Sequence, residues 1–217
     1  MKDFDAVVFD MDGVLLDSET PLIQAFEERA AARGLKADIA AICHRCLGVT
    51  RDISRRVWQA EFGEDFDYDA MRDEAYALFM EKTAAGVPMK PYVPEMLAWL
   101  KAAGKKVGLA SSTPWAVVTK ELKTDGLIDY FDALVCGDMV SRSKPDPAIY
   151  LEACRRLGVD PRRSAGIEDS FAGVRAVKAA GMLTIMVPDI LQPDEATREA
   201  ADYVAPSMAE VRRYLEE

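Results

Sequence analysis

The sequence has few of the residues that build zinc or disulfide sites, and it has fewer basic than acidic residues. Its 217 residues include one histidine and four cysteines, and 27 Lys and Arg residues are outnumbered by 37 Asp and Glu residues, giving a net charge of −10 at pH 7. This acidic balance argues against a general nucleic-acid binder or membrane binder. An anionic substrate would therefore need a local positive site, or a metal ion, to overcome the overall field.

Long apolar runs are also missing from the chain. No stretch approaches the roughly 20 apolar residues that span a bilayer. The first five residues include Asp3 and Asp5 and lack the basic segment of a signal peptide. We therefore expect a cytoplasmic protein with no membrane contact, in which the cysteines stay reduced.

Cys43-His44-Arg45-Cys46 is the segment that most resembles a zinc or redox motif. A zinc site needs further ligands, and the other two cysteines are isolated in the sequence. A redox C-x-x-C follows a strand in a thioredoxin-like unit, whereas this one lies in a helical pattern. A structural role is favoured, and the sequence does not say which.

The most informative stretch lies near the N-terminus. The apolar run Ala6–Phe9 fits a strand buried on both faces, and Asp10, Asp12 and Gly13 follow it directly. Buried carboxylates need a partner, and Mg²⁺ prefers carboxylate and carbonyl oxygens. Because ligands of open α/β sheets bind at the carboxyl ends of strands, this stretch predicts a parallel sheet whose active site begins at Asp10. Taken alone, the pattern also fits a strand followed by a solvated acidic turn.

Beyond this strand the pattern changes twice. From residue 21 to about 87 it is helical, which indicates about four helices inserted between the first strand and the rest. After residue 94, helices alternate with strands expected at 106–111, 133–136, 164–167, 182–187 and 203–204. The alternation predicts an α/β fold with a doubly wound parallel sheet. Residues 1–16 and 92–217 would form this core, and residues 17–91 a helical domain.

Three further polar stretches lie where an expected strand gives way to a loop. Ser111 would offer a hydroxyl at a strand end. Lys144 precedes a proline-stiffened turn, from which a lysine can reach a phosphate or a carboxylate. Glu168 and Asp169 form a second carboxylate pair. Each also has an ordinary explanation, as a turn, a surface lysine, or acids that stabilise a helix N-terminus.

The order of these groups along the chain resembles the haloacid dehalogenase superfamily, in its phosphatase and β-phosphoglucomutase branch. Asp10-Met11-Asp12-Gly13-Val14 matches the first motif, Ser111 the second, Lys144-Pro145 the third and Glu168-Asp169 the fourth. The resemblance covers the whole chain. It implies a Rossmann-like core with an inserted helical cap, and an enzyme acting on small phosphorylated metabolites, with sugar phosphates as candidates.

The resemblance also implies a role for each matched residue. Asp10 would attack phosphorus and form an aspartyl-phosphate, while Asp12 would act as general acid and then as general base. Ser111, Ser112 and Lys144 would hold the phosphoryl oxygens as charge spreads over them.

A magnesium site follows from the same resemblance. Mg²⁺ would be bound by the Asp10 side chain, the Asp12 backbone carbonyl and Asp169, with Glu168 supporting the site from outside the ligand set. Asp12 also separates this chain from dehalogenases and phosphonatases, which typically lack it. The intact set of residues favours an enzyme over a catalytically idle binding protein on the same scaffold.

Specificity is expected to come from the helical insertion. The segment Leu47–Arg51 resembles the part of the cap that places a basic residue over the substrate, although Arg51 also fits a helix surface. Leu22 stands where the mutase has a histidine, and Tyr92 stands where many members have a hinge glycine. We therefore favour a phosphatase over a β-phosphoglucomutase-type phosphohexomutase, and we expect a monomer whose individual substrate the sequence does not name.

Overall fold

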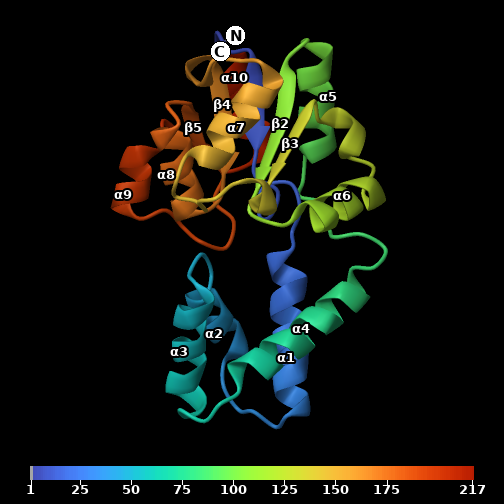
Figure 1. Ribbon diagram of the computed structural model, residues 1–217, viewed down its shortest axis with the longest axis vertical. Helices are drawn as coiled ribbons and strands as arrows, with labels where there is room; N and C mark the ends of the chain where they lie inside the picture. Colours follow the sequence, from blue (N-terminus) through green and yellow to red (C-terminus); the bar gives the residue numbers. More distant parts are fainter. Residues whose placement is uncertain (1) are drawn as a thin grey trace. The chain divides into compact units, whose positions relative to one another are not determined.

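The computed structural model describes residues 2–217 and divides into two compact units (Figure 1). Asp17–Pro88 forms one unit, built of helices. The chain up to Leu16 and the segment Met89–Glu217 form the other, which holds the sheet. No helix within residues 2–217 is both long enough and apolar enough to cross a membrane.

A six-stranded parallel sheet lies at the centre of the α/β unit (Figure 1). The strand order is β3-β2-β1-β4-β5-β6, and every pairing is parallel. This confirms the predicted doubly wound sheet. The strands are β1 (Ala6–Phe9), β2 (Lys106–Ser111), β3 (Ala133–Cys136), β4 (Ser164–Glu168), β5 (Leu183–Met186) and β6 (Tyr203–Val204).

The first strand takes the centre of the sheet because it has no polar face. All four of its side chains are fully buried, as a strand covered on both sides requires. The strand order reverses at β1, with β2 on one side and β4 on the other. Such a reversal opens a crevice at the carboxyl edge of the sheet, directly after Phe9.

Helices cover both faces of the sheet. Right-handed crossovers put α5 on one face, where the chain moves from β1 to β2, and α7 and α8 on the other, where it moves back past β1. The helices of this unit are α5 (Val93–Ala102), α6 (Trp115–Thr124), α7 (Ala148–Leu157), α8 (Phe171–Ala179), α9 (Glu195–Ala200) and α10 (Met208–Glu216).

Two strand glycines allow α7 and α8 to pack closely on the sheet. Val8 lies in register between Gly108 and Gly166. A Cβ atom on Gly108 would lie 2.9 Å from Leu157 Cδ1, and one on Gly166 would lie 2.5 Å from Val177 Cγ1. The absence of a side chain at these two positions therefore allows α7 and α8 to pack directly on the strands that lead to the site.

The helical unit has its own core. Its helices are α1 (Glu19–Ala32), α2 (Ile39–Arg45), α3 (Arg51–Phe62) and α4 (Tyr68–Lys82). The Trp58 ring is 1% exposed and stacks on Phe66 at a centroid distance of 5.6 Å, with Phe26 at 5.4 Å. Aromatic pairs of this kind add stability beyond the area that they bury.

The cysteines of the helical unit contribute to this packing. Cys43 on α2 is a buried free thiol, and Cys46 is a partly buried one. Burial raises the pKa of Cys43 to about 12, so the thiol stays protonated at neutral pH. A buried protonated thiol packs as a small apolar side chain.

We expect Gly166→Ala to lower the free energy of unfolding by about 1–3 kcal/mol, because the added methyl group meets a packed helix side chain. Urea unfolding measures this cost. In a Val177→Ala background the same substitution should cost distinctly less, since both Cγ atoms that it meets are gone. An equal cost in the two backgrounds would show that the contact with α8 is not the cause.

Candidate active site

Three carboxylates meet at the carboxyl edge of the sheet. Asp10 follows β1, Glu168 ends β4, and Asp169 comes next in the chain. Phe9 pairs with Ile167, and the Asp10 N–H donates to the Ile167 carbonyl at 3.0 Å, so the two strand ends lie level. One carboxylate oxygen from each of the three acids lies within 4.8 Å of the others.

Lys144 reaches this cluster from the loop between β3 and α7. Its ammonium donates to Asp10 Oδ1 at 2.6 Å, to Glu168 Oε1 at 2.6 Å and to the Ala110 carbonyl at 3.0 Å. The Lys144 side chain is only 8% exposed. Three acceptors for three N–H donors leave the lysine held as a fixed point charge between two strand ends.

The charges of the cluster perturb one another. Burial raises the pKa of Asp10 to about 7; the Lys144 ammonium opposes this rise, while the Glu168 and Asp12 carboxylates add to it. Burial disfavours the charged form of Lys144, but Asp10 and Glu168 outweigh it and raise the Lys144 pKa. One ammonium among several carboxylates leaves excess negative charge, which suits the binding of a cation.

Glu168 has its carboxylate oxygens committed to protein donors. Besides Lys144, the Tyr150 hydroxyl donates to Oε1 at 2.7 Å, and the Ser170 hydroxyl donates to Oε2 at 3.0 Å. A Cβ atom on Gly173 would lie 1.8 Å from the Glu168 carboxyl carbon, so only glycine fits there. The Glu168 carboxylate is therefore held by Lys144, Tyr150 and Ser170.

Tyr150 is a site residue that the sequence analysis missed. Its ring is fully buried on α7, and the Lys144 ammonium lies 5.2 Å from the ring centroid. Burial, together with the neighbouring Glu168 and Asp10 charges, raises the Tyr150 pKa well above its ordinary value, so the phenol remains a donor. In the sequence it reads as one more apolar position of a helix.

Asp169 fits the first loop closely. Gly13 has a φ angle of +77°, and a Cβ atom there would lie 2.2 Å from Asp169 Oδ2. The loop after β1 therefore approaches Asp169 to a distance that only glycine permits. Asp10 and Asp169 both offer hard oxygen donors, so the residues present fit a divalent cation such as Mg²⁺.

Asp12 is contacted from the end of β2. The Thr113 hydroxyl donates to Asp12 Oδ2 at 3.0 Å, and the Thr113 N–H donates to Ser111 Oγ at 3.1 Å. Ser111 is fully buried, and its hydroxyl holds the turn that brings Thr113 to Asp12. Thr113 was also missed, because its sequence position indicates only the start of a helix.

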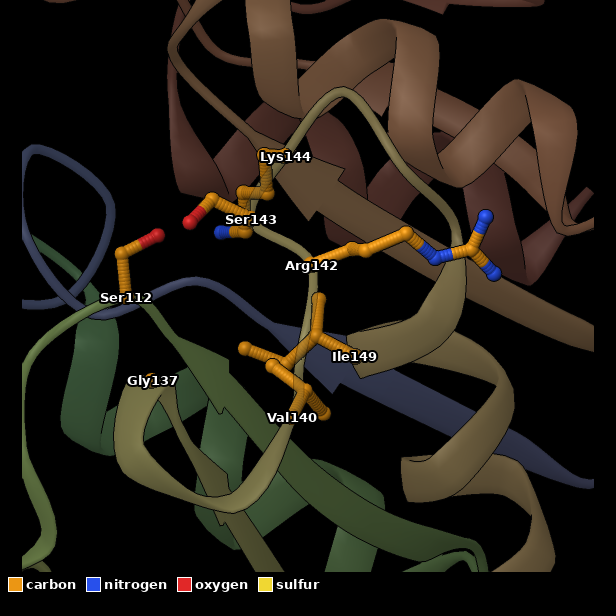
Figure 2. Close-up of a pocket in the computed structure, with 7 residues that line it drawn as sticks. All are labelled: Ser112, Gly137, Val140, Arg142, Ser143, Lys144 and Ile149. Carbon is orange, nitrogen blue, oxygen red and sulfur yellow. The ribbon is translucent and has the colours of Figure 1, made fainter. Parts of the chain in front are cut away.

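A small pocket of about 50 Å³ adjoins Lys144. The Ser112 hydroxyl points toward Lys144, whereas the Arg142 guanidinium points away from both (Figure 2) and pairs with Asp146 at 2.9 Å. A Cβ atom on Gly137 would lie 2.1 Å from the Ser112 carbonyl, so the β3 end abuts this turn. The pocket residues are Ser112, Gly137, Val140, Arg142, Ser143, Lys144 and Ile149.

Arg51 belongs to the helical unit, where it begins α3. Its Nη2 atom lies 2.8 Å from Asp69 Oδ1, and Arg55 contacts the other oxygen of Asp69 at 3.0 Å. Half of the Arg51 side chain is exposed. The guanidinium is thus part of an exposed ion-pair cluster within that unit.

Known proteins resemble this chain over most of its length. A model of the haloacid dehalogenase-like hydrolases matches residues 4–181. Hexitol phosphatase B of Escherichia coli (strain K12) is 36% identical over 187 residues, which cover 84% of this chain and 83% of that protein. Phosphorylated carbohydrates phosphatase of Thermotoga maritima is 33% identical over 218 residues, which cover 98% of this chain and 99% of that protein.

A solved structure gives the same result. The HAD family hydrolase from Deinococcus radiodurans R1, solved with bound phosphate and sodium, superimposes with a TM-score of 0.84 at 31% identity. The superposition covers 98% of this chain and 95% of that one. The similarity therefore includes the sheet and the helical unit.

We expect the change in stability that Asp10→Asn causes in the metal-free protein to be more favourable at about pH 8 than at about pH 5. Between the ordinary aspartate pKa and about 7, folded Asp10 holds a proton that the unfolded chain has released, so stability falls as pH rises through this range. Asparagine removes this cost, which is on the order of 1–4 kcal/mol.

Thermal unfolding in the presence of a chelator measures the effect at both pH values. The exposed Asp129→Asn serves as the matched control for loss of one carboxylate. The same change in stability at both pH values would contradict the raised pKa.

Proposed function

Because the chain belongs to the haloacid dehalogenase-like hydrolases, we propose that it is a Mg²⁺-dependent phosphatase of small phosphorylated metabolites, with sugar phosphates as the first class to test. The observation that carries the proposal is the meeting of Asp10, Asp169 and the Lys144 ammonium at one sheet edge. Relatives named as hexitol and carbohydrate phosphatases support the substrate class.

The metal would be held by the Asp10 and Asp169 carboxylates and by the Asp12 backbone carbonyl. When bound, Mg²⁺ would offset the repulsion between these acids and a phosphate dianion. Glu168 would stay outside the ligand set, because Lys144, Tyr150 and Ser170 already occupy its oxygens.

In the first step, an Asp10 carboxylate oxygen attacks phosphorus and the ester P–O bond breaks, which leaves an aspartyl-phosphate. Lys144 and the Ser111–Ser112 turn hold the phosphoryl oxygens. Asp12 gives its proton to the departing alkoxide. The Thr113 hydroxyl supports this role by fixing one Asp12 oxygen.

In the second step, water attacks the phosphorus of the aspartyl-phosphate. Asp12, now ionised, takes a proton from that water, the bond to Asp10 breaks, and inorganic phosphate leaves. The site is then ready for another ester, with the Asp10 carboxylate returned to its contact with Lys144.

Arg51 is proposed as the contact for the non-phosphorylated part of the substrate. Its support is the sequence pattern around residues 47–51 and its position at the start of α3. It would exchange its exposed partner Asp69 for the substrate, and such surface ion pairs are worth only about 0–1 kcal/mol.

We expect Asp10→Asn to lower kcat on phosphate esters by several orders of magnitude, because the covalent route disappears. Phosphate release with and without Mg²⁺ measures turnover, and circular dichroism checks the fold. Asp129→Asn, an exposed change of the same type, should retain activity. Substantial turnover by Asp10→Asn, or undiminished wild-type turnover after exhaustive chelation, would be incompatible with this mechanism.

The fate of the phosphoryl group separates a phosphatase from a phosphomutase. With β-glucose 1-phosphate and a trace of the 1,6-bisphosphate, we expect free phosphate, because Leu22 stands where the mutase has a histidine. Both products are followed by enzymatic assay, beside a panel of other sugar phosphates. Glucose 6-phosphate with little free phosphate would identify a mutase, and no turnover of any ester would favour a binding role.

A further inference from the structure

The loop after β5 brings another acid, Asp189, to the sheet edge that carries Asp169. One carboxylate oxygen of Asp189 lies within 4.8 Å of an oxygen of Asp169. Asp189 Oδ1 accepts a hydrogen bond from the Lys90 ammonium at 2.5 Å. Both side chains are mostly buried, at 21% exposed for Lys90 and 15% for Asp189.

Lys90 also contacts the loop that follows Asp10. Its backbone N–H donates to the Leu15 carbonyl at 2.9 Å, in the loop that follows Asp10. Lys90 therefore ties Asp189 to the same loop that contributes the first carboxylate of the site. The Lys90 ion pair engages only one of the two Asp189 carboxylate oxygens.

The other oxygen of Asp189, Oδ2, is buried. Among residues 2–217, Asp189 Oδ2 is a buried atom for which the structure gives no hydrogen-bond partner. A buried carboxylate oxygen without a donor is costly, so a donor is expected in the functional state. Mg²⁺ characteristically keeps several bound waters, and the O–H groups of such waters are donors.

We propose that Asp189 is a positioning residue that accepts a hydrogen bond from a water bound to the cation at Asp169. The inference rests on the metal site of the proposed function and assigns a residue outside its ligand set. Acceptors of this kind orient the groups bound to a metal, and their loss typically costs about 10–100-fold in metal affinity.

The test measures Mn²⁺ binding to the metal-free full-length protein, with free Mn²⁺ followed by electron paramagnetic resonance. Asp189→Asn should weaken binding about 10-fold, and Asp169→Ala should abolish it. Lys90→Met should bind at least as tightly as the wild type, because Asp189 keeps its charge and loses its competing ammonium. Glu195→Gln, an exposed acid beyond the same loop, is the matched control and should not change the affinity.

Three results would overturn the assignment while leaving the metal site intact. Equal losses of Mn²⁺ affinity in Asp189→Asn and Lys90→Met would mean that the ion pair matters only for folding. A loss of Mn²⁺ affinity in Asp189→Asn as complete as in Asp169→Ala would make Asp189 a direct ligand. An unchanged affinity in Asp189→Asn would also reject it. The double variant Lys90→Met/Asp189→Asn, which leaves no unpaired charge, replaces the single variant if that one fails to fold.

If Asp169→Ala binds Mn²⁺ as the wild type does, the proposed metal site itself is wrong. The proposed role of Asp189 is then wrong as well. Asp169→Ala therefore distinguishes a failure of the metal site from a failure of the Asp189 assignment alone. Thermal unfolding of each metal-free variant accompanies the titrations, so that a change in affinity is not confused with a loss of fold.

Discussion

The arrangement of the site depends on the buried contact of Lys144 with Asp10 and Glu168. None of these charges would be tolerated alone at this depth, and removing one partner from a buried pair typically costs about 3–5 kcal/mol. The contact draws together the ends of β1 and β4 and the loop after β3, while the Ala110 carbonyl adds β2. Four separate segments must therefore converge for the Lys144 ammonium to find its three acceptors. Correct folding of the sheet and formation of the site therefore depend on each other.

Space for these charges comes from residues that have no side chain. Gly13 leaves room for Asp169, and Gly173 leaves room for Glu168. Tyr150 joins the apolar core to this cluster of charges. Its ring packs in the apolar core beside α7, and its hydroxyl donates a hydrogen bond to Glu168. Hydrophobic packing of the helix on the sheet thereby sets the orientation of a polar group at the edge of the site.

The return from the helical unit includes a strained backbone position. Tyr92 has a φ angle of +68°, in the left-handed region that glycine favours and that a bulky residue occupies at a cost of roughly 1–2 kcal/mol. Its hydroxyl accepts a hydrogen bond from Arg212 on α10 at 3.0 Å, and the neighbouring Lys90 is paired with Asp189. The segment from Lys90 to Tyr92 is thus attached to the α/β unit by two side chains, a restraint that glycine could not provide.

The sequence by itself determined the family, the parallel sheet and the positions at which acidic, hydroxyl and basic groups follow the strands. These are local properties, because an apolar run such as Ala6–Phe9 predicts a buried strand whichever strands it pairs with. Only the tertiary structure decided which groups meet. Lys144 lies 134 residues from the Asp10 that it contacts, and neither Tyr150 nor Asp189 carries any local sign of its partner. Such contacts depend on strand register and on which side chains are buried together, and neither is encoded within a short window of sequence.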